Sequence, residues 1–278
     1  NDLKLKEISS FGLFVFVGGA SVMLVTRLDM MMIGSMLDLE QVAFYTVAFF
    51  IGNAIKVPGK SIAAISSPLV AKALEKLDYK ETQTLYTKSS INQLIIAGAL
   101  FLCIWLNIDD IFSLLPAKFQ GGKWVVFYIS IAQLFNMITG INGTIIVNSK
   151  YYRYDLYTNV ILVVTTVITN YFLILKYGID GAAMATAISI SLFNFIRLIL
   201  IKVKMNMHPF SLQTIKTILL LFVMFFALDF LPDSSYAFVD IIWKSIVVFI
   251  LFIWAVVYFN LSEDINKLII EVRKKISR

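Results

Sequence analysis

Long runs of apolar residues, separated by short polar segments, recur along the whole chain. A helix needs about 20 mostly apolar residues to cross the hydrocarbon core of a bilayer. Eight stretches meet this requirement, at 11–33, 42–66, 91–108, 124–147, 156–175, 182–201, 212–231 and 239–259. The pattern therefore predicts an all-α polytopic membrane protein with eight transmembrane helices.

The composition agrees with a membrane protein and excludes several other classes. Hydrophobic residues make up 59% of the 278 residues, charged residues make up 15%, and the mean hydropathy is +0.83. Soluble domains contain about 45–50% apolar and about 25% charged residues. A soluble core of this size cannot hide so much apolar surface, and the same numbers exclude a disordered chain and a coiled coil.

Lysine and arginine collect on alternate loops. Of the 24 basic residues, 17 fall at Arg197 or in the segments 1–10, 72–90, 149–155, 202–216 and 260–278. The opposite loops hold four, against eight acids, and lie at 34–41, 109–123, 176–181 and 229–244. Cytoplasmic loops carry an excess of Lys and Arg, so both ends of the chain are expected in the cytoplasm. The net charge of +6 follows this asymmetry, and no nucleic-acid partner is expected.

The residues needed for metal, nucleotide or catalytic chemistry are scarce. One cysteine, Cys103, and one histidine, His208, leave no His/Cys metal cluster to build. The chain has no P-loop, so ATP hydrolysis is not expected. The predicted outer loops are too short for a catalytic domain. We therefore expect the chain not to be an enzyme, and we expect no metal and no cofactor.

The last segment, 261–278, has the pattern of an amphipathic helix. Leu261, Ile265 and Leu268 recur at helical spacing, and basic residues lie elsewhere around the helix. Such a helix is expected to lie on the anionic inner leaflet, with membrane lipids as its partners. The segment 72–90 shows a weaker form of the same pattern.

Ionisable residues inside the predicted spans mark a candidate functional site, because charge within lipid is costly. Arg27 and Asp29 lie in the first span. They are two residues apart, so they do not face each other on a helix and each needs a partner elsewhere. The alternative is a position near the outer interface, where both side chains reach the headgroups.

The second span carries a more informative pattern. Asn53, Lys56 and Lys60 fall on one polar stripe at 100° per residue. Pro58-Gly59 is expected to kink the helix beside them. Because the apolar stretch continues to Ala71, Lys56 is predicted near the bilayer midplane, too deep to be explained as an anchor.

Uncharged polar residues repeat this theme in later spans. Asn136 lies in the fourth span and Asn170 in the fifth, each among other polar or small residues. Amides bond across helices, and small residues allow close helix contact. Helix packing and a polar cavity both explain these residues, and the two interpretations are compatible.

Several short motifs together resemble a known family. They are Thr26-Arg27-Leu28-Asp29-Met30-Met31-Met32-Ile33-Gly34, Val42-Ala43-Phe44-Tyr45-Thr46-Val47-Ala48, Pro58, Ser67-Pro68-Leu69-Val70-Ala71 and Tyr177-Gly178-Ile179-Asp180-Gly181-Ala182-Ala183. With these motifs the chain resembles the polysaccharide exporters, or oligosaccharide flippases, of the multidrug/oligosaccharidyl-lipid/polysaccharide exporter superfamily. The resemblance covers most of the chain.

The resemblance implies two six-helix lobes related by a parallel repeat, often followed by two extra helices. The chain then corresponds to the second lobe and a peripheral helix pair, and the N-terminal lobe of the same protein would be a missing partner. The expected domains are 1–205 as a six-span transporter lobe, 206–260 as two additional transmembrane helices, and 261–278 as an amphipathic cytoplasmic tail.

The cargo implied by the resemblance is a lipid-linked oligosaccharide carrying a pyrophosphate, a polysaccharide precursor moved across the bacterial cytoplasmic membrane by alternating access. Asp29 is the candidate for coupling to an ion gradient. The candidate substrate-binding residues, whose basic members match the anion, are Arg27, Lys56, Lys60, Asn53, Asn136 and Asn170. Two alternatives remain. A cation-coupled small-molecule antiporter of the same superfamily favours a negative cavity, and a membrane-embedded glycan polymerase or ligase needs Arg and His in a large outer loop.

Overall fold

The computed structural model describes residues 27–234 and 236–276. The described residues form helices and no strand, which confirms the all-α fold. After a helical segment at 27–36, the elements are α2 (Leu39–Asn53), η1 (Ala54–Lys56), α3 (Val57–Glu75), α4 (Tyr79–Leu106), α5 (Ile108–Ser113), η2 (Ala117–Gly122), α6 (Lys123–Ile138), α7 (Asn142–Val147), α8 (Arg153–Met205), α9 (Leu212–Ala227), η3 (Leu228–Phe230), α10 (Ala237–Tyr258) and α11 (Glu263–Ile276).

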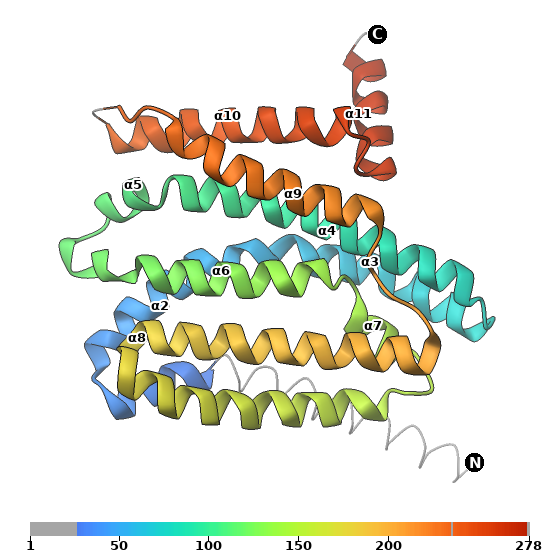
Figure 1. Ribbon diagram of the computed structural model, residues 1–278, viewed down its shortest axis with the longest axis horizontal. Coiled ribbons are helices and arrows are strands. Elements are labelled where there is room, and N and C mark those ends of the chain that lie inside the picture. Colours follow the sequence, from blue (N-terminus) through green and yellow to red (C-terminus); the bar gives the residue numbers. More distant parts are fainter. Residues whose placement is uncertain (1–26, 235, 277–278) are drawn as a thin grey trace.

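Several of these helices match a bilayer in length and polarity. Within the described ranges, four helical segments are long and apolar enough to cross a membrane, namely 39–75, α4, α8 and α10, while α9 is a shorter apolar helix. The 53 residues of α8 include a sharp reversal at Gly178, where φ is +60° and ψ is −135°. Figure 1 shows the two halves of α8 lying side by side as a hairpin. The number of eight spans stays a prediction.

The loops alternate between the two ends of the bundle, as the sequence predicts. In Figure 1 the start of α2, the loop between α5 and α6, the turn of α8 and the loop before α10 lie at one end. The turn between α3 and α4, the start of α8, the start of α9 and the junction of α10 with α11 lie at the other. The basic and the acidic loops are therefore segregated to opposite ends.

Helix α4, which contains most of the third apolar stretch at 91–108, begins earlier than the apolar pattern indicates. It starts at Tyr79 rather than near residue 91, because the Asp78 carboxylate accepts a hydrogen bond from the Glu81 backbone N–H at 2.9 Å and caps the helix. Leu77, with φ +56°, makes the tight turn from α3. Residues 72–90 comprise the end of α3, a short turn and the first part of α4. Their interfacial position stays a prediction.

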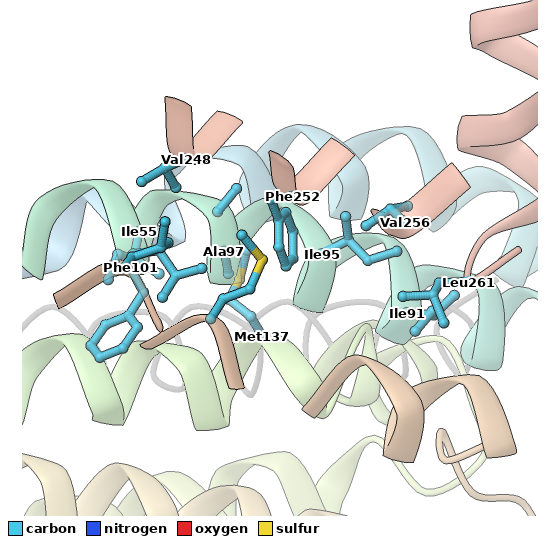
Figure 2. Packing of buried hydrophobic residues seen from close by; sticks show 14 residues of the cluster. Ile55, Ile91, Ile95, Ala97, Phe101, Met137, Val248, Phe252, Val256 and Leu261 are labelled. Atoms are coloured by element: carbon cyan, nitrogen blue, oxygen red, sulfur yellow. The ribbon is translucent and has the colours of Figure 1, made fainter. Parts of the chain in front are cut away.

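The additional helices α9 and α10 pack on α4 through the largest apolar cluster. Figure 2 shows Phe252 and Val256 of α10 beside Ile91 and Ile95 of α4, with Met137 of α6 on the other side. Lipid tails are as apolar as these side chains, so burial alone does not hold the helices together. Close fit therefore stabilises this contact, and a cavity left by truncation here is the damaging change.

The hairpin of α8 depends on glycine at its turn. A Cβ atom at Gly181 would lie 2.0 Å from the Leu173 carbonyl oxygen, and Ala182 and Ala183 beside it are fully buried. Small residues of this kind let two helix backbones approach closely. The motif that runs from Tyr177 to Ala183 therefore has a structural role at the turn.

Candidate functional site

A polar pocket of about 270 Å³ opens between α3, α6, α7 and α8. Its walls are amides, glycines and cations, and its polar lining includes Lys56, Lys60, Gln93, Asn136, Asn142 and Arg197. Of the residues that the sequence assigns to substrate, the structure brings together Lys56, Lys60 and Asn136. The pocket is at the level of the 3-10 turn η1, where α2 passes into α3.

The helix changes its winding beside the two pocket lysines. Ala54–Lys56 form one 3-10 turn, and Pro58 occupies the first turn of α3, where its missing N–H is tolerated. The expected irregularity at Pro58-Gly59 is thus found just before the proline. A Cβ atom at Gly59 would lie 2.6 Å from the Met137 sulfur, so glycine lets α3 approach α6 here.

A break between α6 and α7 forms another wall of the pocket. Gly140 has φ +62°, and a Cβ atom there would lie 3.1 Å from the Ser90 backbone nitrogen. The Ser90 hydroxyl donates to the Ile138 carbonyl at 2.6 Å, and the Thr139 hydroxyl donates to the Asn136 carbonyl at 2.7 Å. Irregular backbone at membrane depth is tolerated where it lines a cavity and its polar groups find partners.

Neither pocket lysine has a carboxylate partner. Lys56 is half-buried and Lys60 is exposed, and across 27–234 and 236–276 no ion pair involves either of them. The two ammonium groups repel each other across the same wall, and each loses part of its hydration. The pocket is therefore an electropositive site that favours an anion.

Arg197 also lines the pocket, and the sequence analysis did not assign it to the site. Its position at the end of a predicted span indicated a cytoplasmic charge, whereas its side chain is only 11% exposed. One guanidinium nitrogen, Nη2, donates to Asp155, and the guanidinium carbon lies 3.9 Å from the centre of the Phe193 ring. The available signal was the three-residue spacing of Asn194 and Arg197, which places both on one helix face.

Amide groups tie the pocket wall to α8. The Asn194 amide nitrogen donates to Asn136 at 3.1 Å, and the Asn194 oxygen accepts from Asn142 at 2.9 Å and from the Thr139 hydroxyl at 3.0 Å. Asn194 is fully buried. This network fixes the oxygen of Asn136, so its position in the pocket is preorganised rather than free.

Asp29 lies in a second, separate polar centre. Its carboxylate is buried, and it accepts hydrogen bonds from the Tyr45 hydroxyl at 3.0 Å, the Asn170 amide at 2.6 Å and the Thr186 hydroxyl. The side-chain oxygen of Asn170, and the hydroxyl of Thr166 four residues earlier on α8, are buried and have no hydrogen-bond partner among the described residues. Asn170 is therefore close to the acid and not to the pocket lysines, and Tyr45 and Thr186 are partners that the sequence analysis missed.

The two remaining candidates lie outside both centres. Arg27 is exposed on the first helical segment, and Asn53 is half-buried one turn before Lys56 with its side-chain oxygen buried and unpartnered. Neither residue lines the pocket. Of the polar stripe on the second span, Lys56 and Lys60 therefore line the pocket and Asn53 does not.

Comparison with known proteins relates this fold to transporters. A family model described as MatE matches residues 15–172. Three solved structures are similar, each over 52% of its own length. A MOP superfamily transporter from Pyrococcus furiosus has a TM-score of 0.56 at 14% identity over 80% of this chain. An outward-facing multidrug resistance MATE family transporter of the MOP superfamily has a TM-score of 0.59 at 15% identity over 87% of this chain. The lipid II flippase MurJ, in an inward closed conformation, has a TM-score of 0.64 at 16% identity over 86% of this chain.

The similarity to these solved structures is a similarity of fold over part of their length. At such identities they show a shared fold, and the chain spans about half the length of the structures that it matches. No curated protein matches the chain.

Proposed function

The chain belongs to the MatE family, and from this premise we propose that it is one lobe of a carrier that moves a lipid-linked oligosaccharide across the bacterial cytoplasmic membrane by alternating access. The solved structures that share its fold are membrane transporters, one of them a lipid flippase. In such carriers the substrate site lies near the bilayer midplane, and one bundle rocks against another. The chain is thus a multi-pass membrane protein whose proposed cargo is a polysaccharide precursor.

The observation that carries this proposal is the pair of pocket lysines without a carboxylate. Lys56 and Lys60 line the pocket together, and the amides of Gln93 and Asn136 lie beside them. A pyrophosphate that links a lipid to a sugar presents several charged acceptor oxygens. Ammonium and amide N–H groups are the donors that such oxygens prefer, and a charged residue at membrane depth marks a functional site by default.

Asp29 is the proposed coupling group. A buried carboxylate surrounded by hydroxyl and amide groups offers the oxygen ligands that a hard cation takes, and it also binds a proton. The unpartnered side-chain oxygen of Asn170 adds a further ligand at the same centre. Because Asp29 lies apart from the pocket lysines, ion binding and cargo binding would occupy different sites in one lobe.

A cation-coupled small-molecule antiporter is the second candidate, and the buried acid Asp29 is the feature that favours it. The pocket itself argues against this candidate, because its ionisable lining is basic. An organic cation would be repelled there. A glycan polymerase or ligase has less support, since the family and the proteins of like fold are transporters.

We also propose the arrangement of the chain in the membrane. Residues 1–205 form the transporter lobe, 206–260 the additional helix pair, and 261–278 a tail at the cytoplasmic surface, with both ends of the chain in the cytoplasm. Figure 1 shows α11 at right angles to α10, the orientation of a helix lying on a bilayer, and Leu268 on α11 is 62% exposed. An N-terminal lobe of the same protein would complete the cavity.

Substitution of Lys56 tests the function. In the full-length protein, Lys56→Met should abolish flipping of the oligosaccharide lipid in membrane vesicles while leaving expression unchanged, and Lys56→Arg should keep partial activity because the charge survives with altered geometry. Lys72→Met is the matched control, since Lys72 is exposed on the same helix and outside the pocket. Normal flipping by the Lys56→Met variant would contradict the proposal.

A further inference from the structure

Arg197 and Asp155 form a buried ion pair beside the pocket. Arg197 Nη2 donates to Asp155 Oδ1, and the side chains are 11% and 14% exposed. The second carboxylate oxygen, Asp155 Oδ2, accepts from the Asn159 amide at 3.0 Å. The pair joins the two halves of the α8 hairpin, because Asp155 lies on the first half and Arg197 on the second.

The guanidinium group has donors left over. Nε contacts the Thr158 hydroxyl at 3.5 Å and Nη2 serves Asp155, whereas Nη1 has no hydrogen-bond acceptor in the portion of the chain that the structure describes. Nη1 is the atom nearest to Gly143, at 2.7 Å from the position of a Cβ there, and Gly143 lines the pocket. An unpartnered donor of a buried arginine therefore faces the same cavity as Lys56 and Lys60.

We propose that Arg197 is a third cation of the anion site, and that Asp155 holds it until an anionic diphosphate competes for it. This inference rests on the proposed function, since it concerns the same pocket. A guanidinium binds phosphate oxygens in a planar, two-donor geometry that a lysine does not provide. When the pocket is empty, Asp155 neutralises the arginine, so the buried cation is paired in both states.

The release of Arg197 from Asp155 increases the positive charge that the pocket offers to the anion, in two steps. Without cargo, Lys56 and Lys60 are the uncompensated cations and attract the anion. Once the diphosphate is bound, Arg197 donates to it through Nη1 and Nη2 together, so the bond from Nη2 to Asp155 weakens. The contact between the two halves of α8 then loosens at the same time as the pocket fills, which makes the ion pair a positioning device as well as a ligand.

Thermal unfolding of the purified full chain measures this competition directly. The probe is inorganic pyrophosphate, titrated against sodium chloride at equal ionic strength, so that screening is constant. Asp155→Asn keeps the shape and the bond to Asn159 but removes the competing charge. It should bind pyrophosphate about tenfold more tightly than the wild type, the effect of one charge-assisted hydrogen bond.

Matched variants separate the role of the arginine from a general change in charge. Arg197→Lys in the Asp155→Asn background keeps the charge without the fork and should lose most of the gain. The double variant Asp155→Asn with Arg197→Gln removes both charges together, so it avoids an unpaired buried ion, and it should bind pyrophosphate several-fold more weakly than the wild type. That comparison also decides the matter if Asp155→Asn alone does not fold.

The outcomes distinguish this inference from the proposed function. An unchanged affinity in Asp155→Asn, or a double variant that binds as tightly as the wild type, overturns the role of Arg197. If Lys56→Met abolishes pyrophosphate binding in the same experiment, the anion site still stands. If wild type and Lys56→Met bind pyrophosphate equally, the pocket is not an anion site and the proposed function fails with it.

Discussion

The chain contains two polar centres between its helices, one around Asp29 and one around the pocket lysines, and charge is paired differently in each. Around Asp29, three neutral donors from different helices saturate one buried carboxylate. In the lysine pocket, two cations share a wall with amides and meet no acid among residues 27–234 and 236–276. The charge of Asp29 is hydrogen-bonded by neutral groups of the same chain, whereas the two lysines have no ion-pair partner among the described residues. The comparison thus distinguishes a charge that stabilises the fold, at Asp29, from charges that are available to bind a ligand, at Lys56 and Lys60.

The largest expected effect comes from emptying the first centre. Asp29→Leu removes the acceptor and leaves the donors of Tyr45, Asn170 and Thr186 buried without partners, which should lower the free energy of unfolding by about 3 kcal/mol or more. Asp29→Asn, which keeps the shape and one acceptor, is the control and should lose less. Denaturant unfolding in a fixed detergent gives both values, and an unchanged stability of the Leu variant would remove the distinction between the centres.

A carboxylate added to the second centre should make it resemble the first. Asn136→Asp preserves the acceptor for Asn194 and supplies the missing negative charge beside Lys56 and Lys60. Pyrophosphate affinity should fall about tenfold, or about 1.4 kcal/mol, because the acid competes for the same cations. Isothermal titration of the full chain measures the change. Equal affinities in variant and wild type would mean that these cations do not bind the anion.

Removal of a pocket cation should not damage the fold. Lys56→Met deletes an uncompensated charge and keeps the length of the side chain, so the free energy of unfolding should stay the same or rise by about 1 kcal/mol. A thermal melt in detergent decides the sign. A clear loss of stability would show that Lys56 is structural, like Asp29.

The smallest expected effect is that of a single methyl group at the edge of the pocket. Gly143→Ala places a Cβ against Arg197 Nη1, a flexible side-chain end that is able to move. Pyrophosphate affinity should fall about twofold, or about 0.4 kcal/mol, because the guanidinium is displaced from the pocket. Gly121→Ala, with no atom within 4 Å of the new Cβ, is the control in the same titration.

The helical fold follows from the sequence, whereas the composition of each centre does so only in part. Apolar periodicity predicts the helices, and basic loops predict which connections share an end of the bundle. Hydropathy did not find the start of α4, because a polar cap at Asp78 rather than an apolar residue sets it. The depth argument for Lys56 identified a wall of the pocket, but the polar stripe also pointed to Asn53, which does not line it.

Contacts between distant segments account for the other residues that were missed. Asp29 and Thr186 are 157 residues apart, and no local pattern couples a carboxylate to a hydroxyl at that separation. Arg197, near the end of the predicted span 182–201, has the sequence pattern of a snorkelling residue, and only the fold of α8 onto itself brings Asp155 beside it. Pairings of this kind need the tertiary arrangement, because single-sequence periodicity reports faces and not partners.

The two halves of the α8 hairpin are joined at Gly178, so a small rotation about this residue moves their far ends by a larger distance. Asp155 and Arg197 each lie about twenty residues from Gly178, which at 1.5 Å per residue gives an arm of about 30 Å. A rotation of about two degrees at the turn therefore displaces the tips by about 1 Å on such an arm. Since a hydrogen bond weakens within that distance, a slight flexing at the Gly178 turn is enough to break or restore the ion pair at the far end of the hairpin.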